Sequence, residues 1–330
     1  MSAQAISLPT TPGPTSVIAC VGETPRAKTI AAVGAQLAQM LDLPLTLLRV
    51  IETVDETGLR PDPLEWDLCR HQARRQLSRL AGDLAFPDDK IGLEVAEGER
   101  VQAICHRANE TGSILVIGTP DSDNSFIWSR DTAQRVLEAS TGPVLLVPDR
   151  AEVCQRSYAR IMVPLDGSSY SEAALVEAIH LARWTGAELL LAHVVPEVAI
   201  TRFGPLECSD VELQLRLSRR NERAACHFLE RTQRHLIDQG IKARSLCLNG
   251  DVRTMLQRTI AAEKPDLLIF TARGQGGKSC HDLTIGSTAN YLLAHLDQPA
   301  LLVRSSQALA KRQQSQSSQL ARRPTPAFAA

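Results

Sequence analysis

The chain alternates short, continuous apolar runs with longer amphipathic stretches. The apolar runs are short, continuous and rich in Val, Ile and Leu. Such runs are typical of parallel strands that crossover helices cover on both faces. The pattern predicts strands near residues 17–22, 44–50, 91–97, 113–118, 143–147, 160–165, 188–195, 241–248, 266–271 and 299–303, with helices in most of the gaps.

The same order of runs occurs twice. TGSILVIGTP (111–120) followed by TGPVLLVP (141–148) corresponds to KPDLLIFTARG (264–274) followed by QPALLVR (298–304). This duplication predicts an α/β protein of two tandem, doubly wound domains. Each is expected to be a Rossmann-like five-stranded parallel sheet with right-handed crossovers and helices on both faces. A ligand crevice would then lie at the carboxyl ends of the strands.

Composition sets the expected domain boundaries. The two domains should occupy residues 16–148 and 158–305, joined by the short polar linker 149–157. The N-terminal tail, residues 1–15, is rich in Pro, Ser and Thr, and the C-terminal tail, residues 306–330, contains a Ser-Gln run. Both tails are expected to be disordered because they cannot bury enough apolar surface to offset the entropy of ordering.

Charge and cysteine content narrow the choice of partners and compartment. The 330 residues include 36 Lys and Arg against 37 Asp and Glu, a formal net charge of -1. Such a balance gives no basic field that would gather nucleic acid or anionic membrane. No apolar run approaches the roughly 20 residues that cross a bilayer. The eight cysteines form no CxxC pair and follow no secretory signal, which indicates a reduced, cytoplasmic setting.

The stretch ARGQGGKS (272–279) satisfies the relaxed pattern of a nucleotide-hydrolysing phosphate loop. In such a loop the Lys-Ser pair opens a long helix, so that backbone amides and the ammonium group converge on phosphate. Here Gly286 interrupts the helix that should continue after Lys278-Ser279, and a convincing helix pattern begins only at Ser287. The loop also follows the fourth strand of its half, whereas a phosphate loop usually follows the first strand. Both features argue against a phosphate-loop hydrolase, which is kept only as the third interpretation.

The second half carries four stretches that resemble a known family: VPLDGSSYSEAAL (163–175), LLLAHVVPE (189–197), the turn NGD (249–251) and GSTANYLLAHLDQPALLV (286–303). Each half resembles the universal stress protein domain (UspA-like), and the whole chain resembles its tandem form. The resemblance implies an adenine nucleotide alpha hydrolase-like fold and a regulatory stress-response function. It also implies an adenine nucleotide, ATP with or without Mg2+, as ligand, and self-association or a partner protein.

Nucleotide-binding members of this family carry G-x2-G-x9-G-S/T between strand four and the last helix, and an aspartate closes strand one. This chain has Thr271, Gly274 and Gly286-Ser287 in the loop, and Asp166 after the strand. Threonine thus replaces the first glycine, and the loop is two residues longer. Glycine lets backbone approach phosphate, and a helix start attracts anions by about 0.3–1 kcal/mol when exposed.

The resemblance therefore implies a nucleotide site in the second half, with no catalytic residue and no metal site. Asp166 would accept hydrogen bonds from the adenosine part, while Arg273 and Lys278 would add charge against phosphate. The full expected set is Asp166, Gly167, Ser168, Val194, Val195, Thr271, Arg273, Gly274, Gly277, Lys278, Gly286, Ser287 and Thr288.

The first half keeps the strand pattern but loses the nucleotide motif. Gly22 stands where Asp166 stands in the second half, Asp121 replaces Gly274, and Arg130-Asp131 replaces Gly286-Ser287. A carboxylate at a helix start occupies the amides that a phosphate would use and repels the phosphate. The first half is therefore expected to serve as a structural partner and docking surface. We expect the halves to pair through their last strands, whose apolar runs would otherwise be open edges.

Simpler roles stand beside each of these assignments. Gly286-Ser287 could be a helix cap alone, Asp166 a turn cap, and Lys278 a solvated charge. The pair Cys280-His281 has no third or fourth metal ligand at a recognisable spacing. A nucleotide-free interaction or scaffold protein is the second interpretation. No water-activating group stands out, so ATP hydrolysis should be slow at most.

Overall fold

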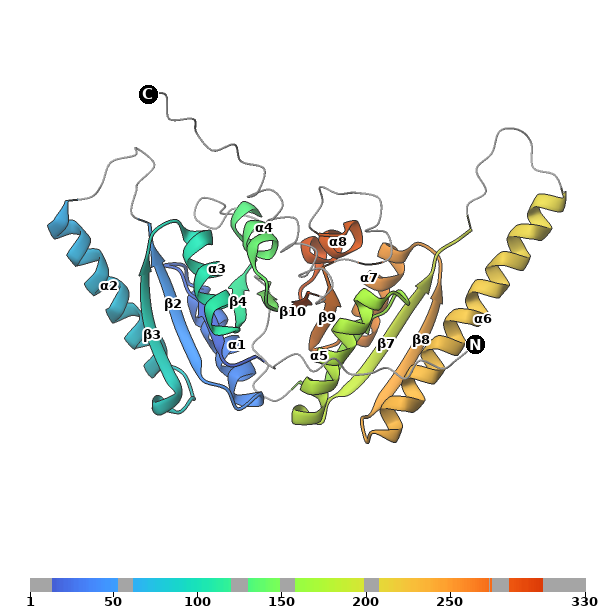
Figure 1. The fold of residues 1–330 in the computed structure, drawn as a ribbon, viewed down its shortest axis with the longest axis horizontal. Helices are drawn as coiled ribbons and strands as arrows, with labels where there is room; N and C mark the ends of the chain where they lie inside the picture. The colour runs from blue at the N-terminus through green and yellow to red at the C-terminus, as the bar shows by residue number, and fades with distance from the viewer. Residues whose placement is uncertain are drawn as a thin grey trace, which may run out of the picture.

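The computed structural model of the chain describes residues 14–52, 62–119, 130–148, 158–198, 208–272, 274 and 285–304. Its elements follow one another as strand and helix in both halves (Figure 1). The first half contains β1 (Val17–Cys20), α1 (Ala27–Met40), β2 (Leu45–Ile51), α2 (Pro63–Gly82), a 3-10 turn (Asp88–Lys90), β3 (Ile91–Glu97), α3 (Arg100–Thr111), β4 (Ile114–Gly118), α4 (Arg130–Ala139) and β5 (Val144–Val147).

The second half repeats this order. It contains β6 (Arg160–Pro164), α5 (Ser169–Thr185), β7 (Glu188–Val195), α6 (Cys208–Asp238), β8 (Ala243–Asn249), α7 (Val252–Glu263), β9 (Leu267–Thr271), α8 (Ser287–His295) and β10 (Ala300–Val303). All the strands that the apolar runs predict are present, and no end differs by more than two residues. The apolar runs locate the strands so closely because strands buried on both faces need apolar side chains throughout.

The strands form one ten-stranded sheet in the order β3-β2-β1-β4-β5-β10-β9-β6-β7-β8. Within each half the paired strands run parallel, in the doubly wound arrangement that the duplication predicts. The halves meet where β5 pairs with β10 in antiparallel register, with Leu145 opposite Leu301. The expected pairing through the last strands is thus confirmed. In Figure 1, β10 lies at the centre of the molecule and α2 and α6 lie at its outer ends.

Two hydrophobic layers cover the two faces of the sheet. One layer holds core residues of α1, α2, α5 and α6, and the other holds core residues of α3, α4, α7 and α8. Both layers cross the junction without a break. Leu145 and Leu301 belong to the first layer, whereas Leu146 and Leu302 belong to the second. The two halves therefore share their core on both faces of the sheet.

Side-chain caps fix where several helices begin. Asp62 accepts a hydrogen bond from the amide of Leu64 and is followed by Pro63, a residue suited to the first helical position of α2. In the second half, Ser168 caps α5 and Asp251 caps α7. Gly186 ends α5 with a positive φ of 71°, a conformation that costs glycine little.

The shared core at the junction should be sensitive to truncation. Leu301 is 1% exposed, so Leu301→Ala should lower the free energy of unfolding by about 2–5 kcal/mol through lost burial and a cavity. Leu93→Ala is the matched control, because Leu93 is 45% exposed on β3 and its truncation should cost less than about 0.5 kcal/mol. Urea unfolding measures both. Equal effects in the two variants would contradict a packed junction.

One carboxyl group lies within the helix layer beside the sheet. Glu177 is partly buried on α5, among the buried residues Val176 and Ala178. Burial raises the pKa of this carboxyl above its ordinary value of 4.5, while the neighbouring His180 acts in the opposite direction. Because the folded state disfavours the charged form, ionised Glu177 destabilises the fold at neutral pH.

Replacing this carboxyl by an uncharged amide should remove that cost. Glu177→Gln is expected to raise the free energy of unfolding at pH 7. The gain should shrink as the pH falls through the raised folded-state pKa and vanish below the ordinary value near 4.5, where both states are protonated. Chemical denaturation across this pH range measures the difference. Glu172→Gln, at an exposed position of α5, should change little at any pH, and a gain that persists in acid would be evidence against a charge effect.

Candidate functional site

The doubly wound order of the second half creates a crevice between β6 and β9. From this point the chain winds outward to β7 and β8 on one side and to β10 on the other. Residues after the carboxyl ends of β6 and β9 therefore meet at the position where open α/β sheets bind ligands. Asp166 follows β6 by two residues, and Thr271 is the last residue of β9.

Asp166 is held by the turn that leads into α5. Its Oδ1 accepts hydrogen bonds from the backbone N and the Oγ of Ser168, at 3.0 and 2.6 Å. Gly167 between them has a φ of 74°, which favours glycine. Ser168 in turn caps α5 by accepting from the amide of Ser171 at 3.3 Å. Asp166 therefore caps this turn through Oδ1, which is the simpler role expected for it.

The second carboxylate oxygen of Asp166 faces Gly274. A Cβ built on Gly274 would lie 2.4 Å from Asp166 Oδ2, far inside van der Waals contact. The backbone that follows β9 thus lies directly against the carboxylate that follows β6. The structure brings together Asp166 and Gly274, the two motif residues that the sequence places in separate stretches. Glycine is needed at position 274 because any side chain there would collide with the Asp166 carboxylate.

The start of α8 lies at the same edge of the sheet. Gly286 is the N-cap of α8, and its amide donates to the carbonyl of Ala272 at 2.7 Å. That bond engages the Gly286 amide and connects the start of α8 to the end of β9. Among the described residues no side-chain oxygen caps α8, in contrast to α5 and α7. Ser287 at the first helical position is exposed and Thr288 is half-buried.

Gly286 has an ordinary backbone conformation. Its φ of -67° and ψ of 151° are values that any residue adopts, so no positive φ requires glycine at this position. These are also the usual values of an N-cap residue. An aspartate could replace Gly286 without backbone strain and would cap the helix.

The remaining expected residues are placed in part. Val194 and Val195 end β7 and are 8% and 6% exposed, so they contribute covered apolar surface beside the crevice. Thr271, which replaces the first glycine of the family motif, is half-buried. The predictions for Arg273, Gly277, Lys278 and the pair Cys280-His281 fall outside the described residues.

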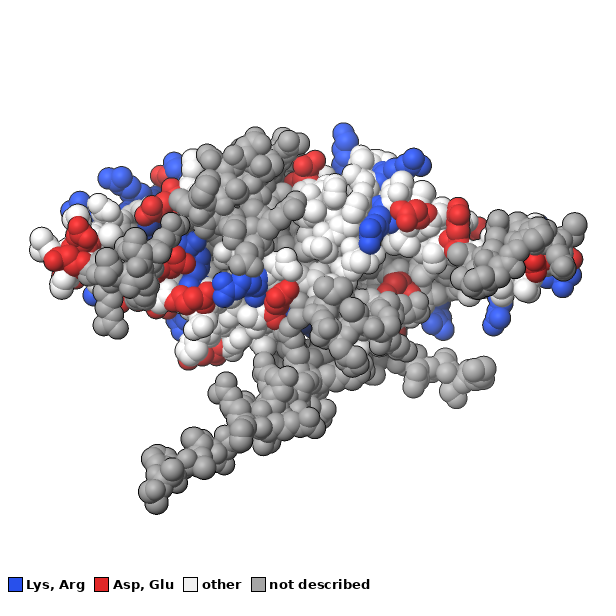
Figure 2. Space-filling view, turned by 90° about the horizontal axis from the view of Figure 1, so that it is seen from above, with Lys and Arg blue, Asp and Glu red and all other residues white. Residues whose placement is uncertain are grey.

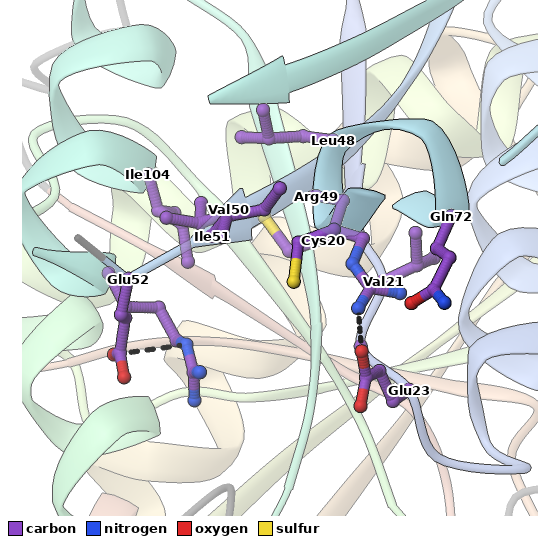
Figure 3. Close-up of a pocket in the computed structure, with 13 residues that line it drawn as sticks. Cys20, Val21, Glu23, Leu48, Arg49, Val50, Ile51, Glu52, Gln72 and Ile104 are labelled. Carbon is purple, nitrogen blue, oxygen red and sulfur yellow. Dashed lines mark hydrogen bonds and ion pairs between the residues drawn. The ribbon is translucent and has the colours of Figure 1, made fainter. Parts of the chain in front are cut away.

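The corresponding edge of the first half is occupied by ion pairs. A pocket of about 200 Å³ lies at the carboxyl ends of β1 and β2. It is lined by Arg49, which pairs with Glu23, and by Arg100, whose Nε lies 3.4 Å from Glu52 Oε1 (Figure 3). At the level of Gly22, the Gln76 side chain of α2 donates to the Gly22 carbonyl at 3.0 Å.

An arginine lies across the other side of the first crevice. The guanidinium of Arg26 donates to the carbonyl of Thr119, directly after β4. This places a side chain at the end of β4, where the second half has backbone at Gly274. No sequence pattern points to Arg26, because its contact joins positions that follow two different strands. The first-half side chains at Asp121, Arg130 and Asp131 are outside what the structure describes.

Other classes of site find no support in the described part of the chain. No group of three or more His, Cys, Asp or Glu side chains is arranged there to hold a metal ion. No described helix is both long and apolar enough to span a bilayer. Basic and acidic side chains are interspersed over the face drawn in Figure 2, and neither sign gathers into one field.

The fold and this edge define a class of protein: two fused, doubly wound α/β domains, with a strand-end crevice lined by an aspartate and a close-packed glycine in the second. The family model described as "Universal stress protein family" matches residues 15–148 and 157–304. The chain therefore belongs to the universal stress protein family, in its tandem form.

Relatives of the same name cover most of the chain. A universal stress protein of Mycobacterium tuberculosis is 24% identical over 282 residues, which is 83% of this chain and 91% of the relative. A universal stress protein of Bacillus subtilis is 26% identical over 147 residues, 44% of this chain and 98% of its own length. The crystal structure of a universal stress protein from Archaeoglobus fulgidus has a TM-score of 0.64 at 16% identity, covers 88% of this chain and 97% of its own, and supports the fold.

The contact between Asp166 and Gly274 can be tested without any ligand. Gly274→Ala should displace the carboxylate and break its hydrogen bonds to Ser168, which lowers the free energy of unfolding by about 1–2 kcal/mol. In an Asp166→Ala background the oxygen that clashes is gone, so the same glycine substitution should cost much less. Chemical denaturation of the four proteins closes a double-mutant cycle. Additive effects would show that the two residues are not in contact.

Proposed function

We propose that the chain is a regulatory stress-response module that binds an adenine nucleotide, ATP with or without Mg2+, in its second half only. The observation that carries the proposal is the close approach of Gly274 backbone to the carboxylate of Asp166 at the strand-end crevice. A larger residue at 274 would displace the carboxylate that the adenosine part of the ligand would contact. We further propose domains at 16–148 and 158–305 joined by 149–157.

The residues at this edge suit the parts of a nucleotide. The carboxylate of Asp166, held at the strand end by Ser168, would accept hydrogen bonds from the adenosine part. The first-turn amides of α8, which no described side chain caps, would receive phosphate at the positive end of the helix dipole. Arg273 and Lys278, on the loop before α8, would add positive charge against the phosphate.

The first half is a poor site for the same ligand. Glu23 and Glu52 already pair with the arginines of its pocket, and a phosphate would have to displace them. Two like charges 4 Å apart repel by about 1 kcal/mol in water and about 4 kcal/mol at an effective dielectric near 20. We therefore assign this half a structural role, as the partner that completes the sheet and offers a docking surface.

We propose that the protein acts as a binding module in the cytoplasm and not as an enzyme. The thiols of Cys20, Cys69, Cys105, Cys226 and Cys247 are free, which suits a reducing compartment. The second candidate function is a nucleotide-free interaction protein. Thr271 favours it, because a half-buried side chain replaces the first glycine of the family's motif at the end of β9.

A pair of substitutions separates the proposed site from a phosphate-loop site. Gly286→Asp places a carboxylate cap at the start of α8, so it should abolish ATP binding while leaving stability unchanged or slightly raised. Lys278→Ala should weaken binding less than about tenfold, as expected for a peripheral ion pair. Isothermal titration with ATP and magnesium measures both, and the wild type should show one site per chain.

The control adds the same charge elsewhere. Gly82 ends α2 with open space around it, so Gly82→Asp should bind ATP like the wild type. Circular dichroism establishes that each variant is folded. Loss of binding in Lys278→Ala with retention in Gly286→Asp would favour the hydrolase interpretation. No binding by the wild type would favour the nucleotide-free protein, and two equivalent sites would contradict the assigned role of the first half.

A further inference from the structure

Helix α6 packs along the outermost strand of the second half, β8 (Figure 1). Side-chain hydrogen bonds fix the helix against the strand at two places. Asn249 Nδ2 donates to Glu222 Oε1 at 2.8 Å near one end of the contact. Towards the other end, Ser245 Oγ donates to Gln233 Oε1 at 2.6 Å, and Gln233 Nε2 donates to the carbonyl of Ala243 at 3.0 Å.

Two cysteines lie between these anchors. Cys226 is one helical turn beyond Glu222, and Cys247 is on the same strand face as Ser245 and Asn249, halfway between them. The hydrogen bonds on either side set the register of α6 against β8 and bring Cys226 opposite Cys247. Both residues are half-buried, and both thiols are free. The anchors on either side therefore hold one thiol of the helix against one thiol of the strand.

The Cys226–Cys247 pair is partly buried and lies beside His193, whose Nδ1 has no hydrogen-bond partner among the described residues. Burial raises the pKa of the Cys247 thiol to about 12, and the hydrogen bond to Cys226 adds to that rise. His193 lies beside Cys247 on the neighbouring strand, in register with it. Its Nδ1 is buried.

The first half shows that the fold does not require these residues. Its corresponding strand, β3, has Val95 where β8 has Cys247, and Val95 is in register with Arg49 instead of a histidine. The cysteine of its corresponding helix, Cys69 on α2, is exposed. The facing thiols are thus a feature of the second half alone.

We propose that Cys226 and Cys247 form a dithiol that a peroxide oxidises to a disulfide between α6 and β8. The inference is independent of nucleotide binding, since it concerns the outer edge of the sheet and not the crevice between β6 and β9.

The chemistry needs the two thiols and one peroxide. Cys226 attacks a peroxide oxygen, so an S–O bond forms, the O–O bond breaks, and hydrogen peroxide leaves one water and a sulfenic acid. Cys247 then attacks the sulfur of Cys226; an S–S bond forms, the S–O bond breaks, and the oxygen leaves as a second water with the Cys247 proton. The thiols lose two electrons, which the peroxide gains.

The order of attack follows from the different environments of the thiols. Cys247 stays protonated at neutral pH because its pKa is raised, so it is the poorer first nucleophile. Once Cys226 is oxidised, Cys247 is the thiol placed opposite it, which makes Cys247 the resolving residue. The disulfide closes the turn between α6 and β8 and fastens the edge strand to its helix.

Peptide mapping of the full-length protein tests the disulfide directly. The protein is treated with equimolar hydrogen peroxide, its remaining thiols are blocked with a maleimide, and it is digested with trypsin. The two cysteines then fall in separate peptides, residues 224–231 and 245–253. We expect these peptides joined, lighter by two hydrogens, and separated again by dithiothreitol. Cys69→Ser, at an exposed position in the other half, should give the same linked pair.

Serine variants test the order of the steps. In Cys247→Ser the oxidation should stop at the sulfenic acid, so peptide 224–231 should carry a dimedone adduct after peroxide. In Cys226→Ser, Cys247 should remain available to the maleimide. Recovery of both wild-type peptides unlinked, or a link between Cys226 residues of two chains, would overturn the proposal. A dimedone adduct on Cys247 in place of Cys226 would overturn the assigned order.

Discussion

The antiparallel pairing of β5 with β10 is the interaction on which the rest of the molecule depends. Each half ends in a short apolar strand, and neither strand has a second partner within its own half. Their pairing removes two open edges that would invite association with other chains. It also joins the cores, since Leu145 and Leu301 pack in one layer while Leu146 and Leu302 pack in the other. A duplicated sequence thereby becomes a single ten-stranded structure.

Within this common frame the halves differ most at the strand ends and in the outer strands. The central strands of both halves must fill two helix-covered faces, so both copies keep mainly Val, Ile, Leu and other apolar residues there. The strand ends carry no such packing requirement. In the first half they hold Gly22 and the guanidinium of Arg26, and in the second they hold Asp166 against Gly274. Tertiary packing thus conserves the sheet and leaves its ligand-binding edge free to diverge.

The two distinctive places of the second half, the crevice and the paired thiols, lie on opposite sides of β7. At the crevice, hydrogen bonds from Ser168 orient one oxygen of Asp166 and leave the other facing Gly274. At the outer edge, bonds from Asn249 and Ser245 hold α6 against β8 around Cys226 and Cys247. In both places side-chain hydrogen bonds set the position of a reactive or charged group.

The sequence alone determined the strands, the duplication, the pairing of the last strands and the stretch that contains the candidate site. Period and composition determine these, because they reflect local burial on two faces of a sheet. Only the tertiary structure decided the contacts between distant positions: Asp166 with Gly274, Arg26 with Thr119, the Gly286 amide with Ala272, and Cys226 with Cys247. Such contacts depend on the order of the strands and on the register of helices against strands. A linear pattern of apolar residues does not show which side chains come into contact in the folded protein.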